Sequence, residues 1–99
     1  YEDEFALAIH NINPEAPIHV LVLVKGEYQD LADLVAHAPA PLVEGYFRAV
    51  GKAADLSGAT RDGCRFISNN GPNSHQEIRH THVHVLGGRP LGPLLATVL

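Results

Sequence analysis

Hydrophobic residues recur at helical spacing through the middle of the chain. Over residues 41–56 they fall at intervals of three and four, which predicts an amphipathic helix. Its apolar positions are Leu42, Val43, Tyr46, Phe47, Val50, Ala53 and Ala54. Pro41 suits the first turn of this helix, and Gly58 suits the residue that follows it. A shorter helix is predicted over residues 30–37, with Asp30 as N-cap and Leu31, Leu34 and Val35 on its buried face.

Four other segments have the pattern of β-strands. They cover residues 4–10, 18–24, 63–68 and 76–86. Segment 18–24 is apolar throughout except for His19, which predicts a central strand buried on both faces. The apolar tail, residues 91–99, is expected to pack on the domain or on a partner subunit.

The last predicted strand alternates histidine with β-branched residues. Successive side chains of a strand point to opposite faces. The alternation therefore predicts a row of imidazoles from His80, His82 and His84 on one face. The opposite face would carry Thr81, Val83 and Val85.

Composition and charge exclude several classes of protein. The chain has 99 residues, which fits one small domain over residues 1–99, and 45% of them are hydrophobic, too many for a disordered chain. Its net charge is −4 and its Lys and Arg residues are scattered, which argues against a nucleic-acid partner. No apolar run reaches transmembrane length, so no membrane partner is expected. The single cysteine, Cys64, indicates a reducing compartment, and a cytoplasmic location is expected.

Three functions compete for the alternating histidines. They could be a solvated strand face, zinc ligands, or groups that react with a phosphate. Zinc lacks an obvious fourth soft ligand beyond Cys64 and the usual ligand spacings, so no metal and no cofactor is expected. A neutral imidazole is a good nucleophile towards phosphorus near neutral pH. The isolated His10 and His37 are interpreted as structural or exposed.

Several motifs together resemble the histidine triad superfamily. The run from His80 to Leu86 is similar to its His-φ-His-φ-His-φ-φ signature, with Thr81 at an apolar position. Residues 11–22 resemble its Asp-Ile-x-Pro-x-Ala-Pro-x-His segment, and residues 69–76 its Asn-rich substrate loop. Residues 84–93 resemble the tail of the HINT-type, nucleotide-binding branch.

The resemblance implies an α+β fold with two helices and an antiparallel five-stranded type of sheet, whose usual N-terminal part is absent from this chain. It implies hydrolysis of nucleoside 5′-phosphoramidates and adenylates, such as adenosine phosphoramidate and aminoacyl- or lysyl-AMP, through a covalent nucleotidyl-histidine. The partners implied are a purine nucleoside monophosphate derivative and a second copy of the chain, as a homodimer. His82 matches the nucleophile, His84 the α-phosphate contact, and His80 and His19 the supporting histidines. The matching nucleotide-binding positions are Asn11, Ile12, Asn69, His75, Gln76, Glu77 and His84.

Two positions depart from the family pattern. Asn11 stands where the family usually has Asp, and Glu77 where some members have Ser. An amide can still bond a ribose hydroxyl, but a carboxylate repels a phosphate. A dinucleoside polyphosphate hydrolase, a nucleotidyl transferase, and a non-catalytic nucleotide- or zinc-binding module remain alternatives.

Overall fold

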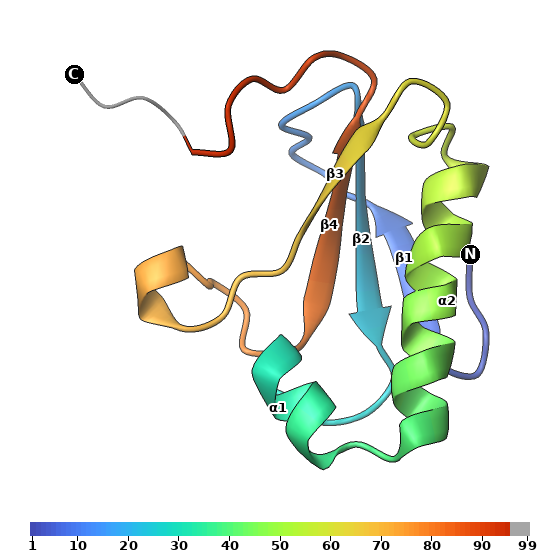
Figure 1. Cartoon of the computed structure of the whole chain (residues 1–99), viewed down its shortest axis with the longest axis vertical. Coiled ribbons are helices and arrows are strands. Elements are labelled where there is room, and N and C mark those ends of the chain that lie inside the picture. Colours follow the sequence, from blue (N-terminus) through green and yellow to red (C-terminus); the bar gives the residue numbers. More distant parts are fainter. Residues whose placement is uncertain (96–99) are drawn as a thin grey trace.

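The computed structural model describes residues 1–95 and contains a sheet with one long α-helix along it and a short α-helix at its lower end (Figure 1). In chain order the elements are β1 (Ala6–His10), β2 (Ile18–Val24), α1 (Leu31–His37), α2 (Ala40–Leu56), β3 (Cys64–Ile67), the 3₁₀ helix η1 (Pro72–Ser74) and β4 (His82–Gly87). The six predicted elements are therefore present. The largest differences in bounds are the starts of the first and last strands, which the sequence pattern places too early.

The sheet is antiparallel throughout, in the order β1-β2-β4-β3. The central pair β2–β4 sets the register of the site, because Leu21 lies opposite His84 and Leu23 opposite His82. The described residues supply four strands of the five-stranded type of sheet that the resemblance implies. The α+β class is confirmed.

Helix α2 lies against one face of the sheet through its smallest residues. Gly45, Ala49, Ala53 and Ala54 are buried together with Tyr46 and Val50. Small side chains let the helix approach closely. A Cβ atom on Gly45 would lie 2.3 Å from a ring carbon of Phe5. The predicted packing of Phe47 is wrong, since it is 45% exposed. One residue along a helix turns about 100°, and Tyr46 already occupies the inward direction.

The short helix α1 is capped as predicted. Asp30 Oδ1 accepts a hydrogen bond of 2.8 Å from the backbone N–H of Asp33. Leu34 is fully buried and Leu31 packs against the core, but Val35 is 54% exposed and was wrongly assigned to the buried face. A helix of two turns presents only a narrow inward stripe.

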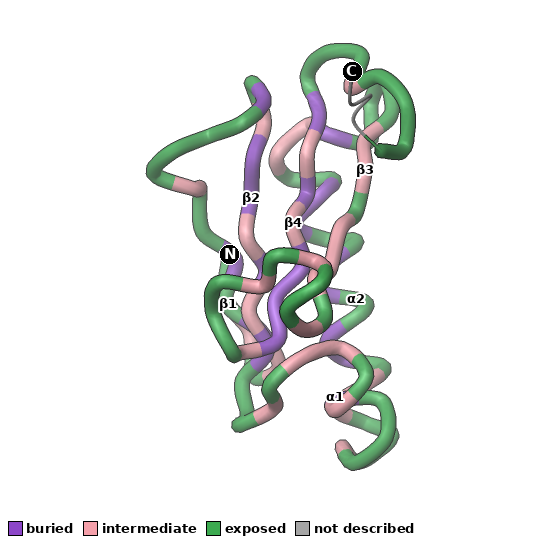
Figure 2. Tube along the Cα trace, turned by 90° about the vertical axis from the view of Figure 1, so that its left-hand side faces the viewer, coloured by how far each residue is buried: buried purple, intermediate pink, exposed green. Residues whose placement is uncertain are grey.

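The two faces of β2 are not equally covered. Val20, Val22 and Val24 are buried in the core, on the side of α2, whereas Leu21 and Leu23 are only partly buried. The buried stretches concentrate on β2, β4 and the inner side of α2 (Figure 2). The prediction of burial on both faces is therefore wrong. The second face of β2 is open because the described residues place no helix over it, and this open face holds the site.

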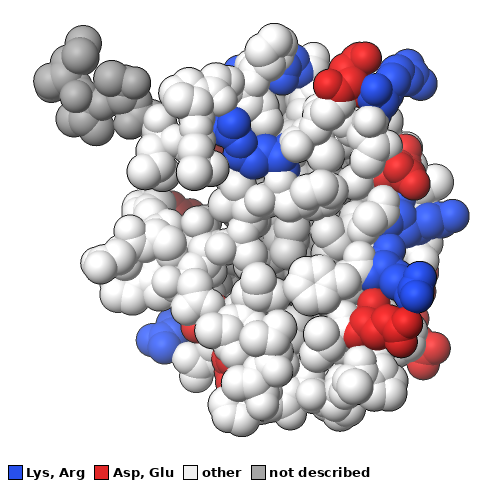
Figure 3. Space-filling model, in the orientation of Figure 1, with Lys and Arg blue, Asp and Glu red and all other residues white. Residues whose placement is uncertain are grey.

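The surface carries acidic and basic side chains mixed along the side that α2 occupies (Figure 3), as in the Arg48–Glu44 pair. No helix within the described residues is long and apolar enough to cross a membrane. In the predicted apolar tail, Leu91 is half-buried, but Leu94 and Leu95 are 82% and 80% exposed and do not pack on the domain. Residues 96–99 lie outside the described part.

Candidate active site

Two of the three alternating histidines lie side by side on the open face of the sheet. The ring centroids of His82 and His84 are 5.1 Å apart, with their planes inclined by 67°. The intervening Val83 is 4% exposed on the opposite, core face, and Val85 is fully buried there. The strand periodicity is thus confirmed for these two histidines.

His80 does not join the row, which corrects the prediction of three imidazoles on one strand face. The chain bends over residues 78–80, and β4 begins at His82. Strand β2, which pairs with β4, ends at Val24, so no residue of β2 lies opposite His80. The ring instead donates from Nε2 to the carbonyl of Val24, at 2.8 Å.

The backbone of His80 nevertheless fixes the ring of His82. Nδ1 of His82 lies 2.7 Å from the carbonyl oxygen of His80. A carbonyl can only accept, so Nδ1 carries the proton and Nε2 of the neutral ring keeps its lone pair. His82 is 8% exposed, and Nε2 has no hydrogen-bond partner among the described residues. A buried imidazole with a free lone pair is suited to nucleophilic attack.

His84 has the opposite arrangement, which a chain of hydrogen bonds determines. The backbone N–H of Glu15 donates to Nδ1 of His19 at 3.1 Å, so the proton of His19 is on Nε2. That Nε2 donates to Nδ1 of His84 at 2.9 Å. The remaining proton of His84 is therefore on Nε2. The structure thus gives neighbouring imidazoles a lone pair on one Nε2 and a proton on the other.

Burial favours the neutral forms of His19 and His84. His19 is 3% exposed, and desolvation lowers its pKa below the ordinary value, with the Glu15 carboxylate opposing the shift. Burial also lowers the pKa of His84, helped by its neighbours His82 and His19 and opposed by Glu15. A neutral His84 leaves Nδ1 available as the acceptor for His19. The hydrogen-bond chain described above therefore exists in the favoured protonation state.

A cavity of about 600 Å³ opens over these rings. Its walls are formed by Asn11, Asn13, Glu15, Leu21, Ile67, Asn69, His75, Glu77, Ile78, His82, His84 and Leu86. This volume suits a small-molecule ligand, and the walls mix apolar side chains with a few polar groups, as such sites do.

Most of the residues that the sequence singled out are brought together here. Asn11 lines the cavity, and its side-chain nitrogen lies 3.2 Å from both ring nitrogens of His19. Asn69, His75 and Glu77 also line it. Ile12 does not, and its side chain is 90% exposed.

Gln76 is absent from the cavity walls, and its side-chain amide holds the surrounding loop together. Oε1 accepts from the backbone N–H of Gly71 at 2.8 Å. Nε2 donates to the carbonyls of Gln29 and Ile78, at 2.6 and 3.0 Å. The sequence predicted a polar loop here, which is present, but not this use of the glutamine side chain.

Glu15 is the main residue that sequence reasoning missed. It occupies a variable position of the Pro-x-Ala-Pro motif, so no pattern distinguished it. It reaches the site because His19, four residues later, accepts a hydrogen bond from its backbone. The link is tertiary geometry rather than a sequence signal.

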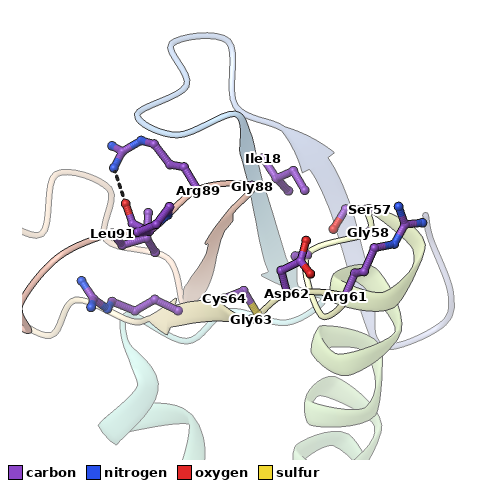
Figure 4. A pocket seen from close by; sticks show the side chains of 13 residues that line it. Ile18, Ser57, Gly58, Arg61, Asp62, Gly63, Cys64, Gly88, Arg89 and Leu91 are labelled. Carbon is purple, nitrogen blue, oxygen red and sulfur yellow. Dashed lines mark hydrogen bonds between the residues drawn. The ribbon is translucent and has the colours of Figure 1, made fainter.

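A second cavity, of about 730 Å³, lies at the end of the sheet away from α1 and contains no histidine. Its walls include Arg61, Arg65, Arg89 and Cys64. Arg61 and Arg89 point away from each other (Figure 4). Arg65 and Arg89 already donate to backbone carbonyls. These guanidinium groups do not converge on a common ligand.

The geometry gives no support to a zinc site. Within residues 1–95, no three His, Cys, Asp or Glu side chains are arranged to hold a metal ion. The lone pair of His84 Nδ1 accepts the hydrogen bond from His19, so this nitrogen is not available to bind a metal ion.

Comparison with known proteins defines the class. The HIT domain family matches residues 1–91. A purine nucleoside phosphoramidase of Escherichia coli strain K12 is 36% identical over 96 residues, covering 97% of this chain and 80% of that protein. A 14 kDa zinc-binding protein of Zea mays is 40% identical over 93 residues, covering 92% and 71%. A HIT family hydrolase of Clostridium thermocellum has a similar structure, with a TM-score of 0.85, 35% identity, and coverage of 97% and 83%.

These matches, together with the paired imidazoles on an antiparallel sheet, place the chain in the histidine triad class of α+β proteins. The chain belongs to the HIT family. Its relatives include hydrolases, and it spans about four fifths of the length of the phosphoramidase.

Proposed function

We propose that this protein hydrolyses nucleoside 5′-phosphoramidates and adenylates through a nucleotidyl-His82 intermediate. The observation that supports this most directly is the complementary state of two adjacent rings. His82 offers a lone pair at Nε2, while His84 offers a proton at Nε2. Attack on phosphorus needs a nucleophile, and departure of an amine needs a proton. The name of the Escherichia coli relative is consistent with this chemistry.

The substrate proposed is a purine nucleoside monophosphate derivative such as adenosine phosphoramidate or aminoacyl- or lysyl-AMP. The phosphate would lie over His82 and His84, with Nε2–H of His84 donating to it or to the leaving group. Asn11 and Asn69 line the same cavity and supply neutral amides for ribose or phosphate oxygens. Leu21 and Leu86 supply apolar wall.

The supporting histidines act differently in this proposal than in the row predicted from sequence. His19 holds His84 in the tautomer that donates towards the substrate. His80 holds His82 through its carbonyl oxygen, while its own ring is bonded to Val24. A proton relay through the His80 ring is not part of the mechanism.

The decisive experiment is to trap the intermediate. With adenosine phosphoramidate, rapid-quench intact mass should reveal an adenylylated protein, and peptide mapping should locate the group on His82. His82→Ala should lower turnover by about three orders of magnitude or more, as loss of a covalent nucleophile does. It should still bind AMP, because the amide contacts remain.

His37 provides the matched control. It is exposed and paired with Asp33 at 2.8 Å, on α1. His37→Ala should retain full turnover. An adduct on another residue, or near-normal turnover by His82→Ala, would refute the proposed mechanism.

The name of the Zea mays relative supports zinc binding as the alternative function, and this alternative has a separate test. Metal binding energy becomes folding energy at a structural zinc site. Loss of thermal stability on adding a strong chelator, with recovery on adding zinc, would favour the metal-binding function.

We also infer that the protein is a homodimer. Strand β3 forms one end of the sheet, and no described strand pairs with its outer edge. Phe66 of β3 is 50% exposed on the face that α2 occupies, and Phe47 of α2 is 45% exposed. An open strand edge that carries an exposed aromatic residue, Phe66, is suited to joining a second copy. Sedimentation at micromolar concentration tests whether the protein is a dimer.

The cytoplasmic location expected from the single cysteine stays a prediction.

A further inference from the structure

The cavity over the histidines is unusual in its charge. Glu15 and Glu77 are among its walls, and none of its lining residues is Lys or Arg. A site that binds phosphate usually supplies cations or many N–H donors. Here the donors are neutral amides and imidazoles, and the formal charges are both negative.

Glu15 is held at the end of the cavity where the proton donor lies. Its backbone N–H is bonded to His19, which is bonded to His84. Its carbonyl accepts from Arg89 at 3.2 Å, which further fixes the segment. The charge of Glu15 raises the pKa of both histidines against the effect of burial. The carboxylate makes no ion pair with any described residue.

Glu77 lies in the wall contributed by the substrate loop. Its carboxylate is 2.9 Å from Nε2 of His75. His75 has a φ of 60°, in the left-handed region that a residue other than glycine seldom adopts. The hydrogen bonds of Gln76, between these two residues, hold the loop in this shape. The loop therefore holds the backbone of Glu77 at the cavity wall, with its side chain 76% exposed at the rim.

The reacting atom belongs to the same cavity as these charges. His82 is only 8% exposed and lines the cavity, and its Nε2 has no hydrogen-bond partner among residues 1–95. Phosphorus must approach this atom. The group that leaves phosphorus then departs in a cavity whose walls carry two carboxylates.

We propose that Glu15 and Glu77 make the cavity favour leaving amines that carry a second, distal positive charge over leaving amines that are neutral or carry a negative charge. The inference rests on the proposed function and deepens it by naming the leaving-group class. Opposite charges attract and like charges repel across the few ångströms of such a cavity.

The chemistry explains why charge acts on the leaving group. The His82 Nε2–phosphorus bond forms while the phosphorus–nitrogen bond breaks. The nitrogen takes the Nε2 proton of His84 while a proton from solvent replaces it, so the ring of His84 stays neutral. The hydroxyl of one water then displaces His82 from phosphorus, and the other proton of that water goes to solvent. The free amine takes a further proton from solvent and leaves as an ammonium ion, and these steps do not change any distal charge that it carries.

The test uses three AMP phosphoramidates of equal size that differ only in distal charge. Their amines carry a 2-aminoethyl, a propyl or a carboxymethyl group, giving a cationic, a neutral and an anionic leaving group. The ratio of kcat/KM for the cationic and anionic compounds is compared in the unaltered protein, Glu15→Gln, Glu77→Gln and the double variant. Glu44→Gln is the control, because Glu44 lies on the exposed side of α2, paired with Arg48.

The unaltered protein should favour the cationic compound. Each single variant should reduce the ratio by about three- to fivefold, as expected for exposed charge pairs, and the double variant by about tenfold or more. Raising the salt to about 0.5 M should reduce the preference of the unaltered protein but not of the double variant. Glu44→Gln should keep the original ratio.

Equal kcat/KM values for the three compounds in the unaltered protein, or a ratio that both variants leave intact, would overturn the inference. Binding separates this failure from failure of the proposed function. Calorimetric affinities of the same compounds should follow the same charge order without turnover. If no compound is hydrolysed but the affinities follow that order, the hydrolytic function fails and the charge selectivity stands. Equal affinities overturn the charge selectivity even if all three are hydrolysed.

Discussion

The hydrogen bond from His19 to His84 gives the most specific prediction about the active site. His19→Leu fills a similar volume but cannot donate to Nδ1 of His84. In the native structure this nitrogen accepts at 2.9 Å from Nε2 of His19, which is 3% exposed. Without the donor, His84 either keeps an unsatisfied buried acceptor or moves its proton to Nδ1. The second outcome turns a lone pair towards the phosphate.

The magnitude follows from that choice. An unsatisfied buried acceptor costs about 1–3 kcal/mol, which corresponds to a loss of about 5- to 150-fold in kcat/KM if the donating tautomer is needed in the transition state. His19→Gln should restore much of the loss, because its side-chain amide can donate to His84 in place of the imidazole. Affinity for AMP should change much less than turnover.

The assay is steady-state hydrolysis of adenosine phosphoramidate, with AMP affinity measured by calorimetry and folding checked by thermal unfolding. His37→Leu serves as a surface control, since His37 is largely exposed. Turnover of His19→Leu within twofold of the unaltered protein would refute the tautomer reasoning. So would an equal loss in the Leu and Gln variants.

Two further predictions concern stability. Burial lowers the pKa of His19 and His84 in the folded state, so the unfolded chain binds more protons below an ordinary histidine pKa of about 6.5. The free energy of unfolding should therefore fall as the pH drops from 6.5 to the folded-state values and level off below them; urea unfolding across this range tests it, and an equal slope in His19→Gln would contradict the assignment. Gly45→Ala should destabilise the protein by about 1–3 kcal/mol, because its Cβ would meet the Phe5 ring at 2.3 Å. Gly51→Ala, in the same helix with no atom within 4 Å of an added Cβ, should stabilise it by about 0.5–1 kcal/mol, and urea unfolding in which both variants shift the same way would contradict the packing.

The sequence by itself determined the elements and the chemistry of the central strand. Side-chain alternation is a local property of an extended chain, so the pattern around Val83 correctly placed His82 and His84 on one face. Periodicity and capping likewise located α2 and the Asp30 cap, because both depend on neighbours within a few residues.

Only the tertiary structure decided where β4 begins and which side chains meet. His80 left the row because β2 ends at Val24, a fact about a strand some 56 residues away in sequence. The Gln76 side chain stabilises the loop because the folded chain brings the carbonyl of Gln29 within hydrogen-bond distance of its Nε2.

The proton positions at the site have the same origin. They depend on His19, which bonds to His84 only after the sheet has formed, and on Glu15, whose backbone N–H bonds to His19. Local patterns predict which residues can react. The lone pair on His82 and the proton on His84 are set by hydrogen bonds to backbone and side chains that the sequence pattern does not place.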